Sequence, residues 1–192
     1  MIAFDAGDHF AELKRLHSQV RRCRKCFLWK TRKKAVPGEG LPDATVMLIG
    51  EAPGKKEDAA GRPFVGPSGK FLDQMLEEVG LVRENIFITS TIKCIPVPAG
   101  KPKKVSIEAC NPYLQGQLKL VNPRIVCLLG EVAARNVLGV DKVADVRGEI
   151  IRRSEHIFLV TYHPAAARRF PALHAHMRKD FRLLARRANI RQ

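Results

Sequence analysis

Short, unbroken apolar runs alternate with segments of helical periodicity, and this alternation limits the possible folds more than any other feature of the sequence. Residues 45–49, 85–90 and 124–130 (TVMLI, NIFITS and RIVCLLG) have the length and continuity of buried strands. Strands that are apolar on both faces are typical of parallel sheets covered by helices. The sequence therefore predicts an α/β fold with helices on both sides of a parallel sheet.

The remaining elements follow from the same periodicities. Helices are predicted at residues 8–22, 67–79, 106–120, 131–139 and 171–188, and further strands at 149–153 and 156–162. The first of these two strands is compatible with one half of a hairpin. A loop rich in proline and lysine is expected at 95–105. The sequence contains no internal repeat and no long linker, so we expect a single domain over residues 1–192.

The formal net charge of +15 comes from 34 Lys and Arg against 19 Asp and Glu. Such an excess favours a polyanionic partner, most often nucleic acid, although solubility or a ribosomal neighbourhood would also account for it. The apolar runs are too short to span a membrane, and the acidic N-terminus does not resemble a signal peptide. We expect a cytoplasmic, nucleoid-associated protein without membrane association, and a monomer by default. Scarce Asn and Gln beside abundant Arg hint at a hot habitat and a thermostable protein.

Three loops follow predicted strands and carry the polar residues of most interest. They are GEAPG at 50–54, STIKC at 90–94 and TYHPAA at 161–166. In open parallel sheets, ligands bind at the carboxyl ends of the strands. We therefore expect these three loops to meet at one crevice, with the carboxylate of Glu51 delivered there between two glycines.

Five cysteines suggest a metal centre rather than a disulfide framework. Cys23 and Cys26 form a C-x-x-C pair, Cys94 and Cys110 lie far downstream, and Cys127 sits in an apolar strand as a buried core thiol. Four thiolates suit either zinc or an iron–sulfur cluster. A redox C-x-x-C pair with two incidental cysteines is the third possibility, and the spacing alone leaves all three open.

Three separated segments resemble, in order, the motifs of the family 4 uracil-DNA glycosylases: GEAPGKKEDAAGRPFVGPSGKFL (50–72), TSTIKCIPVP (89–98) and TYHPAA (161–166). The resemblance covers roughly residues 20–185. It implies a three-layer α/β/α sandwich with a central four-stranded parallel sheet. The implied activity is base excision repair: the enzyme flips uracil out of DNA and hydrolyses its N-glycosidic bond, leaving an abasic site.

The resemblance also implies a cofactor and partners. Its ligand pattern falls on Cys23, Cys26, Cys94 and Cys110, which would hold a structural [4Fe-4S] cluster. The implied partner is uracil-containing DNA. A sliding clamp is a further conceivable partner, but neither end of the sequence carries a clear clamp-binding peptide.

Five positions receive roles at the reacting base. Glu51 would activate the attacking water or stabilise the cationic sugar, and His163 would donate to uracil O2. The backbone amides around Gly50 and Ala52 would bind uracil oxygens, and Phe64 would stack on the flipped base. The simpler interpretations are a capping or surface glutamate, a core phenylalanine and an ordinary hydrogen-bonded histidine.

Ser90 departs from the family pattern. The family usually has asparagine there, whose side chain meets both O4 and N3–H of uracil. A serine hydroxyl has less reach, so the resemblance leaves the base range open between uracil alone and other deaminated bases such as hypoxanthine or xanthine. Asp58 is expected at the pocket rim, or in a purely structural role, together with Glu57.

Several basic residues are candidate DNA contacts. Arg168 and Arg169 follow the His-Pro motif and would enter the duplex or hold phosphates, with solvated surface charge as the alternative. Lys101 and Lys103 in the loop KPKK, and the segment RRCRK at 21–25, are further phosphate-binding candidates.

Three rival functions remain besides a shifted base range. A branch of the superfamily traps DNA covalently through a histidine in an added basic loop, but the loop at 95–105 has no histidine. A non-catalytic sensor of uracil-containing DNA is a second rival, against which Glu51 and His163 argue. A zinc-bearing nucleic-acid-binding module is the third, and a colourless protein with stoichiometric zinc would favour it.

Overall fold

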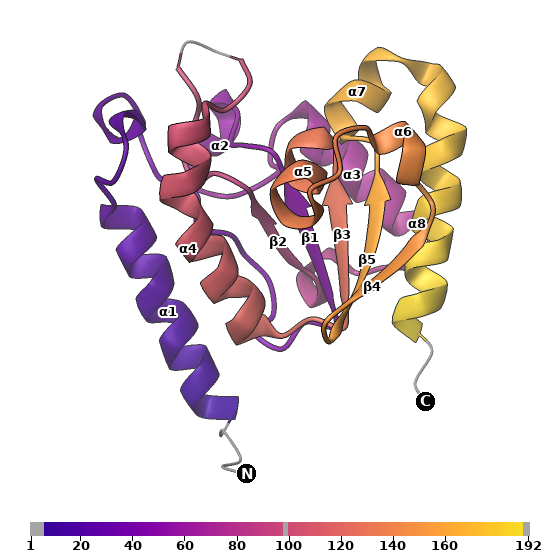
Figure 1. The fold of residues 1–192 in the computed structure, drawn as a ribbon, viewed down its shortest axis with the longest axis horizontal. Helices are drawn as coiled ribbons and strands as arrows, with labels where there is room; N and C mark the ends of the chain where they lie inside the picture. Colours follow the sequence, from indigo (N-terminus) through magenta and orange to yellow (C-terminus); the bar gives the residue numbers. More distant parts are fainter. Residues whose placement is uncertain (1–5, 98–99, 190–192) are drawn as a thin grey trace.

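The computed structural model describes residues 6–97 and 100–189 (Figure 1). Pro98 and Ala99, in the loop expected at 95–105, lie outside the described residues. A five-stranded sheet forms the centre, with strands β1 (Val46–Gly50), β2 (Phe87–Ser90), β3 (Ile125–Leu129), β4 (Ile150–Arg153) and β5 (His156–Thr161) in the order β2-β1-β3-β5-β4. The first four strands in this order are parallel, and β4 runs antiparallel to β5.

The expected number of strands was therefore wrong by one, although four strands are parallel as expected. The extra strand β4 is joined to β5 by a tight turn in which Ser154 adopts a left-handed φ of 53°. Its residues are half-buried or exposed, as befits an edge strand, so it lacks the continuous apolar run of the central strands. The pairing of β4 with β5 confirms the hairpin interpretation of residues 149–153.

Helices cover both faces of this sheet (Figure 1). They are α1 (Ala6–Arg22), α2 (Lys55–Ala60), α3 (Pro67–Glu77), α4 (Lys104–Val121), α5 (Glu131–Leu138), α6 (Val143–Val146), α7 (Pro164–Arg169) and α8 (His174–Asn189), with short 3-10 turns η1 (Phe27–Lys30), η2 (Arg83–Asn85) and η3 (Pro171–Leu173). The C-terminal helix expected from residue 171 begins with η3 and continues as α8.

Alternate residues of β1 face opposite hydrophobic layers. Val46 and Leu48 pack into the layer formed with α3, α7 and α8. Met47 and Ile49 pack into the layer formed with α4 and α5, against which α1 lies. This division confirms the predicted three-layer α/β/α sandwich, because each strand supplies one side chain to each layer in turn.

The parallel strands end at the same edge of the sheet. Gly50 pairs with Ser90 at the ends of β1 and β2, and the ladder continues as the Thr91 amide donates to the Gly50 carbonyl at 2.8 Å. The amide of Gly130, just after β3, donates to the Thr161 carbonyl at the end of β5 at 2.9 Å. The loops that follow β1, β2, β3 and β5 therefore begin at the same edge of the sheet. In the part of the chain that is described, no helix has the length and apolarity needed to cross a membrane.

Candidate active site

A cavity of about 500 Å³ opens at this edge of the sheet. Glu51 and Ala52 from the loop after β1, Ser90 from β2 and His163 from the loop after β5 all line it, together with Phe64. The expected convergence of the three loops is confirmed.

Glu51 presents a half-buried carboxylate to the cavity. Its backbone carbonyl accepts from the Ile92 amide at 3.2 Å, which fixes the main chain beyond the end of β1. Its carboxylate oxygens have no hydrogen-bond partner within residues 6–97 and 100–189. Burial raises the pKa of the Glu51 carboxyl above its ordinary value, while Lys101 acts to lower it and Glu131 to raise it. The carboxylate is thus available to a ligand in a partly desolvated setting.

His163 caps the N-terminus of α7 and faces the same cavity. Its Nδ1 accepts from the Ala165 amide at 3.1 Å, so the proton of the neutral imidazole resides on Nε2. Burial lowers the pKa of His163 to about 4, which keeps the ring neutral at physiological pH. His163 is therefore a neutral donor through Nε2 rather than an imidazolium.

Phe64 has a backbone conformation that few residues other than glycine adopt. Its φ is 50°, in the left-handed region, and its side chain is only 8% exposed. The ring centroid lies 5.8 Å from that of His163, at an interplanar angle of 31°. A Cβ on Gly50 would sit 2.6 Å from Phe64 Cζ, and a Cβ on Gly69 would collide with the Phe64 carbonyl. The close contacts of Phe64 with Gly50 and Gly69 therefore fix its ring over the end of β1. A residue other than glycine with a left-handed φ is strained, and such strain is typical of functional sites.

Glu57 holds the loop that carries Phe64. One of its carboxylate oxygens accepts from the amides of Val65 at 2.9 Å and Gly66 at 2.7 Å. The other accepts from the Gly54 amide at 3.1 Å at the start of α2. Sequence reasoning left Glu57 between a structural and a rim role. The sequence did contain a signal for the structural role. Glu57 lies three residues after Gly54, and this is the spacing at which a glutamate at the start of a helix accepts from the amide of the N-cap residue.

Ser90 is supported from beneath by a buried lysine that sequence reasoning missed. Lys93, 1% exposed, donates from Nζ to the Ser90 carbonyl, the Thr89 hydroxyl and the Gln117 amide oxygen, each at 2.7 Å. Burial lowers the pKa of Lys93 to about 7. No pattern in the sequence distinguishes this lysine from the many at the surface.

Asp58 lies away from the cavity lining. It is buried at 6% exposure, and its two carboxylate oxygens accept from the Lys33 amide at 3.0 and 3.1 Å. The contact ties α2 to the segment that precedes β1, so Asp58 anchors the backbone in this structure.

The four cysteines outside β3 gather in a separate hydrophobic cluster. Cys94 and Cys110 are buried within it, and Cys23 and Cys26 pack against it half-buried. Cys127 belongs instead to the core layer on one face of the sheet. Across residues 6–97 and 100–189, no group of three or more Cys, His, Asp or Glu side chains is arranged to hold a metal ion.

This cysteine cluster has hydrogen-bond donors beside its sulfur atoms. Arg32 Nη1 lies 3.3 Å from Cys94 Sγ, and its other nitrogen, Nη2, donates to the Arg21 carbonyl at 3.1 Å. The Lys25 amide lies 3.4 Å from Cys23 Sγ. Such donors stabilise thiolate sulfur, the form in which cysteine ligates metals and iron–sulfur clusters.

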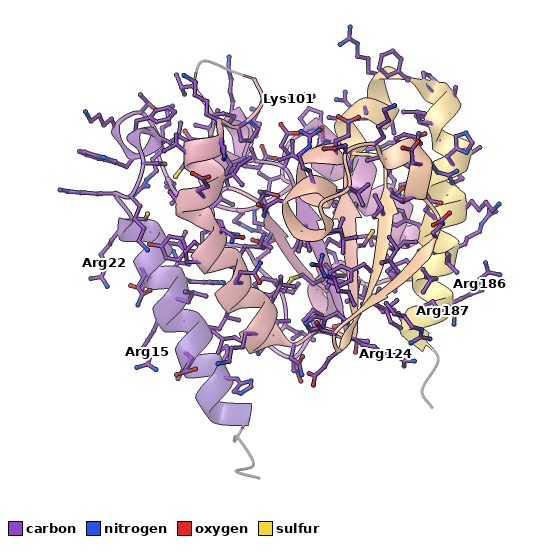
Figure 2. The ribbon with its side chains drawn as sticks, viewed as in Figure 1. Arg15, Arg22, Lys101, Arg124, Arg186 and Arg187 are labelled. Carbon is purple, nitrogen blue, oxygen red and sulfur yellow. The ribbon has the colours of Figure 1, made fainter. Side chains whose placement is uncertain are left out.

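The candidate DNA-contacting residues occupy exposed positions near the cavity. Arg168 and Arg169 lie in the last turn of α7, and the Arg169 guanidinium is 5.4 Å from the Phe170 ring centroid. Figure 2 shows Lys101 at the end of the molecule where β3 and β5 terminate, whereas Arg186 and Arg187 project from α8 on another side. The basic charge is therefore distributed over several surfaces.

Comparison of the sequence with models of known protein families identifies the class of protein to which this chain belongs. A family model described as the uracil DNA glycosylase superfamily matches residues 37–186. The chain belongs to the uracil DNA glycosylase superfamily.

The relatives narrow the class further. A Type-4 uracil-DNA glycosylase of Sulfurisphaera tokodaii is 41% identical over 180 residues, which cover 88% of this chain and 82% of the relative. Type-4 uracil-DNA glycosylases of Pyrobaculum aerophilum and Archaeoglobus fulgidus are 41% and 36% identical, covering 88% and 85% of this chain and 91% and 87% of the relatives. The resemblance to family 4 inferred from the motifs is confirmed.

Proposed function

We propose that the protein excises uracil from DNA by hydrolysing the N-glycosidic bond and leaving an abasic site. The observation that carries the proposal is the meeting of Glu51, His163 and Phe64 in one cavity at the carboxyl ends of the strands. The names of the type-4 relatives support the same substrate and reaction.

The reaction needs stabilisation of opposite charges at two places. As the bond breaks, positive charge develops on the sugar and negative charge on the departing uracil. We assign the Glu51 carboxylate to the sugar side, where it stabilises the cation or orients the attacking water. We assign Nε2–H of His163 to uracil O2, because a neutral imidazole whose Nδ1 is already occupied can donate only from Nε2.

Binding of the flipped base would come from the surfaces around these two groups. The Phe64 ring offers a face for stacking beside His163. The backbone amides around Gly50 and Ala52 are assigned to uracil oxygens, and Ser90 to the base edge. Arg168, Arg169, Lys101 and Lys103 are assigned to phosphates on either side of the flipped nucleotide.

A second candidate function is excision of other deaminated bases, and Ser90 favours it. The side chain that lines the cavity there has a single hydroxyl, which cannot pair with two adjacent groups of uracil as an amide can. Specificity for uracil would then rest less on this contact, and hypoxanthine or xanthine become candidate substrates.

We propose that Cys23, Cys26, Cys94 and Cys110 hold a [4Fe-4S] cluster. Four cysteines in one apolar cluster fit its ligand set, and the Arg32 donor beside Cys94 fits an anionic sulfur. When bound, the cluster would supply cross-linking between segments rather than redox chemistry. The cysteines themselves tie the end of α1 to the loop after β2 and to α4, so residues 1–192 would act as one domain.

The test is an excision assay with purified protein on DNA carrying one uracil, followed by alkaline cleavage of abasic sites. Parallel substrates carry hypoxanthine, xanthine or a G·T mismatch, and Ser90→Asn is assayed beside the wild type. We expect cleavage at uracil, with a higher rate or sharper preference in Ser90→Asn. Cleavage at another base only would support the second candidate, and no cleavage by a folded protein that binds uracil-containing DNA would refute both.

A further inference from the structure

A second, smaller cavity of about 190 Å³ adjoins the first. The two cavities share Pro96 and Gly100 in their walls, so a ligand in one lies directly beside a ligand in the other. Pockets for drug-sized ligands usually exceed about 300 Å³. The small volume suits a single planar ring better than a whole nucleotide.

A buried hydroxyl without a partner lines this second cavity. Ser106, in the first turns of α4, is 1% exposed, and its Oγ makes no hydrogen bond to any other described residue. Buried polar groups in proteins nearly always have a partner. The hydroxyl is therefore a hydrogen-bonding group available to whatever enters the cavity.

The same cavity is bordered by an exposed aromatic ring and by lysines. Phe27 in η1 is 39% exposed, and Lys103 Nζ lies 5.6 Å from its ring centroid. Lys101 also lines the cavity and pairs with Glu131 at 3.6 Å through side chains that remain largely exposed. Aromatic faces interleaved with cations are typical of surfaces that bind single-stranded nucleic acid.

We propose that the second cavity is a subsite for the base of a nucleotide immediately next to the flipped uracil. The base stacks on Phe27, its polar edge pairs with the Ser106 hydroxyl, and the lysines hold the adjoining phosphate. The proposal rests on the proposed function, because the first cavity must receive the uracil. Charge complementarity and the shared wall together favour a DNA occupant over a free small molecule.

Ser106 has one competing role. It lies one helical turn before Cys110 in α4, so its hydroxyl could instead serve the sulfur atoms of the cysteine cluster. That role would leave the exposed ring of Phe27 at the wall of the cavity unexplained. The two roles differ in their consequences, and the experiment separates them.

The experiment measures single-turnover excision from single-stranded oligonucleotides in which a tetrahydrofuran abasic analogue replaces each neighbour of the uracil in turn. We expect the wild type to lose about tenfold in rate at one of the two neighbours, the scale of one lost base-stacking contact. On the strand that retains both neighbouring bases, Phe27→Leu should excise uracil at the rate that the wild type shows when that neighbour is abasic. The abasic analogue should then cause no further loss of rate in this variant.

Phe10→Leu is the matched control. Phe10 is 45% exposed, with Lys14 Nζ 3.9 Å from its ring centroid. It belongs to the N-terminal part of α1, and this part of the helix lies at the opposite end of the molecule from the carboxyl ends of the parallel strands (Figure 1). This variant should respond to the missing neighbour as the wild type does. Ser106→Ala should reduce the neighbour dependence and leave the visible absorbance of the protein unchanged.

Equal wild-type rates on all the oligonucleotides would overturn the subsite, and so would a neighbour dependence that survives in Phe27→Leu. Altered absorbance in Ser106→Ala with intact neighbour dependence would assign the hydroxyl to the cysteine cluster and overturn its role in the subsite. Failure of the proposed function gives a different result, because no oligonucleotide would then be cut.

Discussion

Replacing Glu57 by glutamine should disturb the active site although Glu57 is assigned no contact with the reacting base. The carboxylate accepts three backbone N–H bonds, from Gly54, Val65 and Gly66, at 2.7–3.1 Å. Hydrogen bonds to charged groups contribute about 1.5–3 kcal/mol each and neutral ones about 0.5–1.5 kcal/mol. The single side-chain oxygen of glutamine can still accept two of the three N–H bonds, as weaker neutral hydrogen bonds. The NH₂ group of glutamine then faces the third backbone N–H, from which it cannot accept a hydrogen bond. These values sum to a loss of about 3.5–6 kcal/mol. Because Glu57 is partly exposed to solvent, which weakens charged interactions, we expect a loss in the free energy of unfolding of about 2–4 kcal/mol.

For a chain of this size, that loss lowers the melting temperature by about 5–15 °C. The loop carrying Phe64 should also shift, and small misplacements can cost about 100-fold in rate. Thermal unfolding by circular dichroism and single-turnover excision measure the two effects. Glu77→Gln, at an exposed position of α3, is the control and should change neither. Wild-type stability and rate in Glu57→Gln would refute the argument that this carboxylate positions the loop.

Three further predictions concern the cavity and the cysteines. Gly50→Ala places a Cβ 2.6 Å from Phe64 Cζ and should lower the single-turnover rate about 100-fold. A urea titration should show that the same variant loses about 1–3 kcal/mol in the free energy of unfolding through overpacking. Because His163 acts as the neutral ring and its pKa is about 4, kcat/KM measured from pH 5 to 9 should not fall as the pH rises through 6.5; a fall there would indicate a required imidazolium. Cys94→Ser should abolish the visible absorbance and bound iron, whereas Cys127→Ser, in the core of β3, should retain both.

The sheet could be predicted because its central strands are apolar on both faces. The continuous apolar runs around β1 and β3 are short, as strands are, and are typical of strands buried on both faces of a sheet covered by helices. The short helices α2 and α7 escaped prediction, because six residues give too few apolar positions for a periodicity. The edge strand β4 was expected as part of a hairpin, but the family resemblance set the strand number at four.

The convergence of Glu51, Ser90 and His163 could also be predicted, since it follows from a rule about where parallel strands end. The supporting contacts could not. Glu57 acts on amides up to nine residues away, and Lys93 reaches a side chain on α4, so their roles depend on tertiary geometry. Because lysines are almost never fully buried, the residue type alone predicts that Lys93 lies at the surface.

The central claim is that Glu51 and His163 stabilise opposite charges across the bond being broken. The most direct test is the single-turnover rate of uracil release by the wild type, Glu51→Gln and His163→Gln, with DNA affinity measured for each. We predict losses of at least about 100-fold in rate for each variant, with affinity for DNA nearly unchanged. Rates within about tenfold of the wild type, or losses matched by equal losses in affinity, would contradict the account.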